Sequence, residues 1–332
     1  MRDKASLAKV TFRPHFKTHQ SNIVASWFMH EGVKQITVSS VSMAFQFAEQ
    51  GWQDITIAFP CNIREIESIN HLGNRVKINL LIDSAATAKF LANNLFQNTN
   101  IYIEIDSGHH RSGVKWDDEK YIINILDILN NSAYTNFRGF LTHSGETYHA
   151  KGEKEIMEIF HQTRKRLLTL KEKHNLDALL SIGDTPSCSL KNEFNGLDEI
   201  RPGNFVYYDL MQESLGVCSY EDIAVAMACP VVSINQSRKE IIIYGGAVHF
   251  SKDHLLTKNN QIVYGLPVKI SENGWSGILQ DSSLERLSQE HGIIKTSTSI
   301  LNQFRVGDLI GILPVHSCLT ADLMKNRTMI IS

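Results

Sequence analysis

The chain carries almost no net charge. Its 33 Lys and Arg residues nearly balance 35 Asp and Glu residues, which leaves −2 at pH 7. No basic field is therefore present to attract a nucleic acid or an anionic membrane surface, and we expect neither as a partner. Long hydrophobic runs are also missing, since no apolar stretch approaches the roughly 20 residues of a membrane-spanning helix. The composition therefore argues against a membrane protein.

Cysteine is scarce as well. The 332 residues contain five cysteines, an odd number with no Cys-x-x-Cys spacing. This usage is typical of a reducing cytosol and not of a disulfide framework. The start of the chain has no signal-peptide pattern, so we expect a cytoplasmic protein. Repeats and low-complexity segments are absent, and the 42% hydrophobic content is enough to bury a sizeable core.

From about residue 19 to 210 the hydrophobic pattern alternates between strand and helix periods. Short β-rich runs occur at Gln35–Val41, Asp54–Phe59, Val76–Ile82, Asn100–Ile105, Phe137–Thr142 and Leu179–Ile182. Helical stretches lie between them at Met43–Gln50, Asn62–Leu72, Ala85–Phe96, Asp117–Asn130 and Glu153–His174. This alternation predicts a parallel sheet with crossover helices.

Two architectures fit that pattern, a closed (β/α)8 barrel and an open doubly wound sheet. Polar and glycine-rich motifs follow nearly every strand, as expected when the loops of one barrel face share a site. No G-x-G-x-x-G motif follows the first strand, which weakens the open dinucleotide-binding alternative. We therefore predict an α/β protein with a TIM-like barrel over residues 1–222.

The texture changes after about residue 222, where helical periodicity fades. Runs that read as strands, separated by turn residues, occur at Ala224–Ile234, Glu240–Tyr244, Pro267–Ser271, Ser276–Leu279 and Asp308–Leu313. We predict a second, mostly antiparallel β domain over residues 223–332.

Lys17 is the first candidate functional residue. It lies in the segment Arg13–His19, directly after an apolar Phe16 and among basic neighbours. Desolvation and nearby positive charge both lower the pKa of a lysine and free its amine to attack a carbonyl. The alternative is a basic turn at the surface.

Two loops late in the predicted barrel are candidates for binding a phosphate. Gly183–Ser187 offers a backbone turn and the hydroxyl of Thr185. In the segment Glu199–Asn204, Gly203 permits close approach of a ligand to the backbone, and the N–H groups of Gly203 and Asn204 can face an anion. Late barrel loops are the usual place of a barrel phosphate site.

Further polar residues follow the middle strands. Arg111 is a fixed cation on the glycine-rich loop Asp106–Gly113 and can pair with a phenolate or carboxylate. The segment Thr142–Tyr148 offers the ring of His143, hydroxyls and a carboxylate. A solvated loop arginine and a structural histidine are the alternatives.

His316 and Cys318 form the candidate metal site. Two positions apart on an extended segment, their side chains can face the same side. A nitrogen and sulfur donor pair suits zinc or another divalent metal, and two protein ligands leave positions open for substrate and water.

Taken in order, these motifs resemble the fold-type III pyridoxal-phosphate (PLP) enzymes, which share an alanine racemase-like barrel. Within them the chain is similar to the D-serine dehydratase and D-threonine aldolase group over about residues 11–324. The matching motifs are R-P-H-x-K-T-H, D-x-G-x-x-R-x-G, H-x-G-x-x-Y, G-x-T-P, R-P-G-N and the closing H-x-C. The ensemble is specific, although no single motif is.

The resemblance implies a role for each candidate residue. Lys17 takes the place of the lysine that holds PLP covalently and acts in catalysis. The remaining cofactor-binding residues are Arg111 near the phenolic oxygen, His143 facing the ring, Tyr148 in the pocket, and Thr185, Gly203 and Asn204 at the phosphate. His316 and Cys318 match the zinc pair of D-serine dehydratases, whereas D-threonine aldolases more often have H-x-D. A homodimer is also implied.

Three departures from the family pattern are visible. Only twelve residues precede Arg13, so we expect a barrel that lacks its first strand–helix unit. The segment Tyr244–Ser251 replaces the expected D-A-G-type turn, and we expect its His249 to be structural. Glu146 stands where relatives often have Asn or His, and a carboxylate here disfavours an acidic substrate.

The resemblance implies a PLP- and metal-dependent lyase acting on a D-3-hydroxy amino acid. We expect zinc-assisted dehydration of D-serine to pyruvate and ammonia, because Cys318 favours a dehydratase. D-threonine aldolase activity, giving glycine and an aldehyde, is the first alternative. A racemase, for which Tyr264 is the only nearby second acid/base, is the second, and a non-catalytic or inactive PLP-binding homologue is the third.

Overall fold

The computed structural model describes residues 1–174 and 176–331, and Ser332, the last residue of the expected second domain, lies outside them. The chain divides into two compact units, Met1–Gly203 and Asn204–Ser332. This division falls before the expected boundary at residues 222–223. The intervening segment belongs to the second unit because its backbone pairs there: Met211 N–H donates to the Val315 carbonyl, at 3.3 Å.

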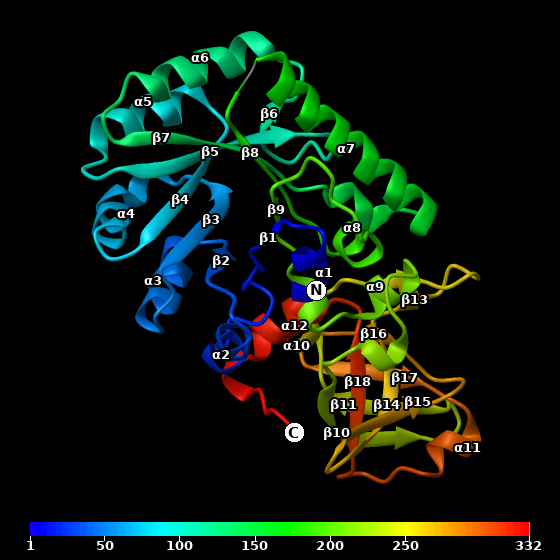
Figure 1. Cartoon of the computed structure of the whole chain (residues 1–332). Helices are drawn as coiled ribbons and strands as arrows, with labels where there is room; N and C mark the ends of the chain where they lie inside the picture. Colours follow the sequence, from blue (N-terminus) through cyan, green and yellow to red (C-terminus); the bar gives the residue numbers. More distant parts are fainter. Residues whose placement is uncertain (175, 332) are drawn as a thin grey trace. The chain divides into compact units, whose positions relative to one another are not determined.

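The first unit is built on a parallel sheet of eight strands (Figure 1). The strands follow the order β1-β9-β8-β7-β5-β4-β3-β2, and every neighbouring pair is parallel. Their bounds are β1 Thr11–Phe12, β2 Gln35–Val38, β3 Asp54–Pro60, β4 Lys77–Ile82, β5 Thr99–Asp106, β7 Thr135–Thr142, β8 Leu179–Ile182 and β9 Glu199–Ile200. A short strand, β6 (Val114–Lys115), pairs with β5. The predicted (β/α)8 barrel is confirmed.

The barrel closes between β1 and β2. His15 forms a parallel bridge with Thr37, whose N–H donates to the Pro14 carbonyl at 2.9 Å. β1 itself has only two residues. The expected loss of the first barrel unit is therefore wrong: β1 supplies the eighth strand and was too short to give a hydrophobic period.

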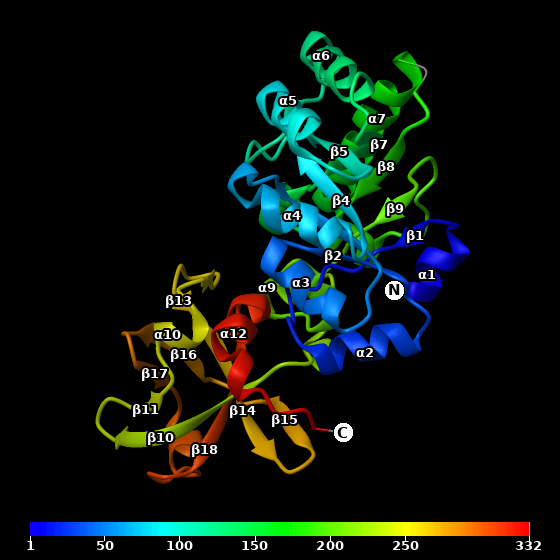
Figure 2. The same ribbon diagram turned by 90° about the vertical axis from the view of Figure 1, so that its left-hand side faces the viewer.

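Helices lie on the outer side of this sheet, as Figures 1 and 2 show for α4, α5, α6 and α7. Side-chain caps start several of them: Ser40 Oγ accepts the N–H of Met43 at 3.1 Å, and the Asp118 carboxylate accepts that of Tyr121 at 3.2 Å. The bounds are α1 Arg2–Leu7, α2 Asn22–His30, α3 Val41–Glu49, α4 Ile66–Gly73, α5 Ala85–Asn94, α6 Glu119–Asn130, α7 Glu153–Lys173 and α8 Thr185–Leu190, with single 3-10 turns at η1 Ile63–Glu65 and η2 Gly145–His149.

The second unit is an antiparallel barrel. Strands β14, β16, β17, β11, β10 and β18 pair in this order, β18 pairs back with β14, and β15 extends the sheet from β14. The strands are β10 Met227–Asn235, β11 Glu240–Tyr244, β14 Gly265–Ser271, β15 Gly274–Ile278, β16 Ser283–Leu287, β17 His291–Lys295 and β18 Leu309–Pro314, and β12 Leu255–Leu256 pairs with β13 Ile262–Val263. Short helices are α9 Leu210–Ser214, α10 Ala247–Phe250, α11 Thr298–Leu301 and α12 Ser317–Met324, and 3-10 turns are η3 Asn204–Val206, η4 Tyr220–Asp222 and η5 Lys325–Arg327. The predicted antiparallel β domain is confirmed.

Alternating side chains of these strands fill the centre of the second unit. The core includes fully buried Cys229, Ile241, Leu284, Ile294 and Ile312. Among the residues that the structure describes, no helix has both the length and the apolar character needed to cross a bilayer.

Candidate active site

Lys17 lies in the loop that follows β1. The Phe16 ring beside it is fully buried, with its centre 5.0 Å from that of Phe47 and 5.1 Å from that of Trp52, both edge to face. Phe16 therefore fixes the loop on the barrel but does not cover the lysine. The expected desolvation of the Lys17 amine by Phe16 is not found, because Lys17 is exposed.

His143 follows the carboxyl end of β7 and lies near the lysine loop. Its Nδ1 donates to the Gly183 carbonyl, which fixes the tautomer and leaves Nε2 without a proton. Burial lowers the pKa of His143 to about 3; the Gly183 bond raises it, and Lys17 and Arg111 lower it. His143 is therefore a neutral ring at neutral pH.

His15, on the lysine loop itself, has a similar environment. Burial lowers its pKa well below the usual value, and Lys17, Arg201, His143 and Arg111 lower it further. The same cations thus act on two neutral histidines at the carboxyl ends of different strands. Such a concentration of positive charge, beside rings that carry none, suits an anionic ligand.

Thr185 lies beyond the carboxyl end of β8. Its hydroxyl is completely buried and has no hydrogen-bond partner among the residues described. Its backbone N–H donates to the Tyr148 hydroxyl at 3.1 Å, so the G-x-T-P loop is tied to the H-x-G-x-x-Y segment. The Tyr148 and His143 rings lie 6.0 Å apart. An unpartnered buried hydroxyl here is what an anionic ligand can complete.

Arg111 occupies the loop after β5. The guanidinium is exposed and makes no hydrogen bond to another described residue. Below it on β5, burial raises the pKa of Glu104, whereas the Ser112 hydroxyl and Arg111 lower it. Ser112 Oγ donates to Glu104 Oε1 at 3.0 Å, and Glu104 Oε2 is buried without a partner. Glu104 is thus a buried acid close to a cation that lacks a hydrogen-bonded partner.

Arg201 lies in the R-P-G-N segment, and the motif alone predicts no role for this arginine. Its Nε donates to Ser181 Oγ at 2.7 Å and its Nη2 to the Thr142 carbonyl at 2.6 Å, next to His143. Burial lowers the pKa of Arg201. The residue links the ends of β7, β8 and β9 from inside the barrel, and its burial was not readable from the motif.

Gly203 packs against the lysine loop. A Cβ here would lie 3.0 Å from Thr18 Oγ1 and 3.1 Å from the His15 carbonyl oxygen, and the Pro202 carbonyl accepts the His15 N–H at 2.9 Å. A side chain at this position would therefore push the two loops apart by a few tenths of an ångström. Its predicted contact with a phosphate stays a prediction.

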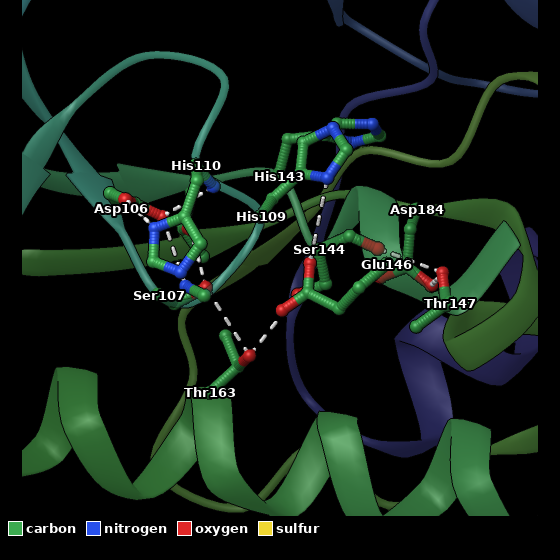
Figure 3. A network of polar contacts seen from close by, with 12 residues as sticks. Asp106, Ser107, His109, His110, His143, Ser144, Glu146, Thr147, Thr163 and Asp184 are labelled. Atoms are coloured by element: carbon green, nitrogen blue, oxygen red, sulfur yellow. Dashed lines mark hydrogen bonds and ion pairs between the residues drawn. The ribbon is translucent and has the colours of Figure 1, made fainter. Parts of the chain in front are cut away.

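His109 and Glu146 form a second polar group beside His143 (Figure 3). The His109 ring lies edge to face with His143 at 5.7 Å, and its Nδ1 is 4.0 Å from Glu146 Oε2, which is buried without a hydrogen-bond partner. Burial lowers the pKa of His109, Arg111 lowers it further, and Glu146 raises it. Glu146 therefore adds negative charge beside the histidine that contacts His143.

His316 is the N-cap of α12 in the second unit, and Cys318 is the second residue of that helix, so the expectation that both lie on one extended segment is wrong. His316 Nδ1 is 2.6 Å from Asp253 Oδ2. Burial lowers the pKa of His316, but hydrogen bonding and charge from Cys318, together with Asp253 and Asp209, raise it to about 9. The imidazole thus interacts with both Cys318 and a carboxylate, as an imidazole and thiol that share a cation do.

Asn204 belongs to this second group through its side chain. Its Nδ2 is 2.6 Å from Asp209 Oδ2, 3.3 Å from Ser317 Oγ and 3.4 Å from Cys318 Sγ. The amide therefore supports the H-x-C segment, and only its backbone N–H remains for the predicted phosphate contact.

His316 and Cys318 can hold a divalent metal only if substrate or water supplies the remaining ligands. Within residues 1–174 and 176–331, no group of three or more His, Cys, Asp and Glu side chains gathers as a metal site. One imidazole and one thiol, with a carboxylate behind the imidazole, match a site completed by substrate and water.

Comparison with known proteins agrees with this arrangement. Residues 1–210 match the family model "Alanine racemase, N-terminal domain", and residues 224–330 match "Putative serine dehydratase domain". D-threo-3-hydroxyaspartate dehydratase of Delftia sp. (strain HT23) is 28% identical over 96% of this chain and 87% of its own. D-serine dehydratase of Dictyostelium discoideum is 27% identical over 98% of this chain and 88% of its own.

A solved structure extends the comparison to the fold. The structure of the Delftia sp. HT23 dehydratase superposes with a TM-score of 0.88 at 27% identity, covering 97% of this chain and 87% of that one. The family model covers more than half of the chain, and its barrel is the one that carries the lysine loop. The chain belongs to the alanine racemase N-terminal domain family, in the branch that also carries a serine dehydratase domain.

Proposed function

We propose that the protein is a PLP- and zinc-dependent lyase that converts D-serine to pyruvate and ammonia. The observation that carries the proposal is the group of cations, Lys17 and Arg111, acting on the neutral ring of His143 at the carboxyl ends of the barrel strands. The similarity of dehydratases over nearly the whole chain supports the same reaction class.

The predicted cofactor-binding residues fit PLP. Thr185 offers a buried hydroxyl that lacks a partner in the described chain, and Gly203 and Asn204 can offer N–H groups to the phosphate. Arg111 would pair with the phenolic oxygen, and the neutral ring of His143 would face the pyridine ring without adding charge. Tyr148 holds the Thr185 loop through its hydroxyl.

Lys17 would both hold the cofactor and move the proton. Its exposed amine would hold the cofactor covalently and, when not so bound, would be the base that accepts the proton from Cα. When bound, PLP supplies a sink for the electron pair left on Cα. Burial, together with Arg111 and Arg201, lowers the pKa values of His15 and His143, which makes both histidines weak bases. We therefore assign the role of base to Lys17.

His316 and Cys318 would hold zinc. The metal supplies Lewis acidity toward the β-hydroxyl of the substrate, which turns hydroxide into an acceptable leaving group. Asn204 donates to the Cys318 sulfur, and Asp253 fixes the imidazole. Cys318 in place of the aspartate of the H-x-D pattern favours dehydration over aldol cleavage of D-threonine.

Glu146 favours D-serine over an acidic substrate. Its carboxylate lies beside His109 and has a buried oxygen without a hydrogen-bond partner among the described residues. A second carboxylate on the substrate would meet this negative charge, and like charges at close range oppose binding.

A racemase and a non-catalytic PLP carrier have less support. Tyr264, the candidate second base of a racemase, packs against the core of the second unit, and its ring lies 5.8 Å from that of His254. A non-catalytic carrier has no need of the second unit or of a His–Cys pair. We also infer a homodimer from the resemblance, to be checked by light scattering, and a cytoplasmic location from the cysteine usage.

An absorption spectrum of the purified protein tests the proposal. We expect the absorption band of a Schiff base between PLP and Lys17. Borohydride should reduce this bond and leave the cofactor irreversibly attached to Lys17, as peptide mapping would show. Lys17→Ala should lack the band. Pyruvate should then form from D-serine, and zinc chelation should abolish it. A protein that stays colourless with added PLP would refute the cofactor, and glycine formed from D-threonine in place of pyruvate would establish an aldolase.

A further inference from the structure

Asp253 stands directly behind the proposed metal ligand His316. It lies between α10 and β12, 63 residues before His316 in the chain, and its Oδ2 is 2.6 Å from His316 Nδ1. A carboxylate can only accept a hydrogen bond, so Nδ1 carries the proton. Nε2 is therefore the ring nitrogen available to a metal, which would displace the proton that Nε2 carries when the imidazole is charged.

The backbone around Asp253 is shaped to hold it there. Ser251 ends α10 with φ +70°, a left-handed conformation that is uncommon for a residue with a Cβ. Its hydroxyl accepts the Asp253 N–H at 3.1 Å, and its own N–H donates to the Ala247 carbonyl at 3.0 Å. Helix α10 is fixed in turn by His249, whose Nδ1 accepts the Gly246 N–H at 3.1 Å.

We infer that Asp253 is a positioning residue for zinc: it sets the tautomer, orientation and basicity of His316. This inference rests on the proposed function, since it concerns the same metal. A carboxylate behind a metal-bound histidine increases the electron density that the imidazole offers to the cation. The exposed fractions of the two side chains, 41% for Asp253 and 30% for His316, leave the pair accessible to an entering ion.

Cys318, the second proposed ligand, has a different kind of support. Asn204 Nδ2 donates to Cys318 Sγ at 3.4 Å, and Asp209 holds the same amide at 2.6 Å. A neutral amide donor adds no negative charge beside the sulfur. Asp253 is therefore the charged group that binds His316 directly, and its removal should weaken metal binding more than loss of a hydrogen bond alone.

Zinc titration of purified full-length variants tests the inference. Metal-free wild type, Asp253→Asn and Asp253→Ala are titrated with zinc chloride against a chromophoric chelator. We expect Asp253→Ala to raise the Kd about 10- to 100-fold, the usual effect of losing such a partner. Asp253→Asn keeps an oxygen acceptor for Nδ1 but loses the charge, so its Kd should lie between wild type and Asp253→Ala. Excess zinc should restore the D-serine activity of both variants.

Asp281→Asn is the matched control, because Asp281 is exposed and distant in sequence from the pair. It should bind zinc with the wild-type Kd. The inference is overturned if Asp253→Asn and Asp253→Ala also bind zinc with the wild-type Kd. If Asp253→Ala fails to fold, Asp253→Asn alone decides by the same criterion. A wild type that binds no zinc, or binds it equally after Cys318→Ala, instead refutes the metal site of the proposed function.

Discussion

Asp184 is a carboxylic acid that the first unit keeps almost completely from water, with 2% of its surface exposed. Its Oδ2 accepts the Ser187 N–H at 2.7 Å and the Thr147 hydroxyl at 3.1 Å, whereas Oδ1 is buried without a partner among the described residues. Burial raises the pKa of Asp184 to about 6; hydrogen bonds from Ser187 and Thr147 oppose the rise, and Glu146 adds to it. The loop that carries Thr185 thus begins with an acid that is costly to ionise.

The size and sign of the effect follow from linkage. A rise of the pKa from 3.8 to about 6 corresponds to about 3 kcal/mol of unfolding free energy. Because the pKa is higher in the folded state, the folded protein binds the proton more tightly. This stability is complete below pH 4 and is lost as the pH rises from about 4 to 6. Above pH 6 Asp184 is ionised, and its whole contribution to the free energy of unfolding has been lost relative to pH 4.

Asp184→Asn removes this pH dependence. The amide oxygen can still accept from Ser187 and Thr147, and an uncharged NH2 group replaces the unpartnered Oδ1. We expect the variant to be more stable than wild type above pH 6 by about 1–3 kcal/mol, since burying an unpaired amide N–H costs part of the gain. Near pH 4 the advantage should disappear.

Urea unfolding followed by tryptophan fluorescence, from pH 4 to 8, measures the difference. The comparison of the two proteins at each pH cancels the titration of all remaining groups. For Asp281→Asn, at an exposed position, the free energy of unfolding should depend on pH in the same way as for wild type. A difference between wild type and Asp184→Asn that does not change with pH would show that Asp184 does not titrate in this range.

Three further predictions concern the free energy of unfolding. Phe16→Ala should lower the free energy of unfolding by about 3–5 kcal/mol, whereas Phe59→Ala at an exposed position should change it by less than about 0.5 kcal/mol, as urea unfolding would show. Arg13→Met leaves the buried Glu199 carboxylate without its cation and should cost about 3–5 kcal/mol. His249→Ala should cost about 1–2 kcal/mol and leave kcat for D-serine unchanged; a large loss of kcat at full zinc loading would contradict a structural role.

The barrel strands were predictable from sequence where they were long enough to show a period. β8 begins and ends at the predicted residues Leu179 and Ile182, and β11 likewise matches Glu240–Tyr244. β1 and β9 have two residues each, which is too few for any periodicity. Short strands that close a barrel are defined by their neighbours. The wrong expectation of a missing unit arose because only twelve residues precede Arg13, and a two-residue β1 shows no periodicity to oppose it.

Helix α2 was missed for a related reason. Its apolar side chains do not keep to one face: Val24 and Ala25 are buried, while Ile23, Trp27 and Met29 are exposed. A helix that is apolar all round gives no amphipathic stripe to detect. Its start was nevertheless readable, because Ser21 Oγ accepts the N–H of Val24, the usual cap spacing.

The candidate site was predictable as motifs but not as a set of contacts. Each predicted residue of the barrel follows the carboxyl end of a strand, as the motif order implies for Lys17, His143 and Thr185, and their roles stay predictions. The partners that tune the site are remote in sequence. Asp253 is 63 residues from His316, and no local pattern marks it as the acceptor. Distances between loops arise from sheet closure, which a linear pattern does not encode.

A polar line inside the barrel connects closure with the candidate site. Arg13 Nε donates to Glu199 Oε2 at 2.6 Å, and Ser181 Oγ donates to Glu199 Oε1 at 2.7 Å. Arg201 then donates to Ser181 and to the Thr142 carbonyl, one residue before His143. Buried charges of this kind contribute little net stability, because desolvation offsets their attraction.

These buried hydrogen bonds and ion pairs therefore act mainly by fixing the positions of the strands. The polar line crosses β1, β9, β8 and β7 in sequence, and every donor and acceptor in it has a fixed direction. The same strands end in the lysine loop, Arg201, the Thr185 loop and His143. A hydrophobic barrel interior of equal volume would close as well, but it would not set the angle at which these four chain segments leave the sheet. The buried ions thus explain why two strands of only two residues can hold the lysine loop in a defined place.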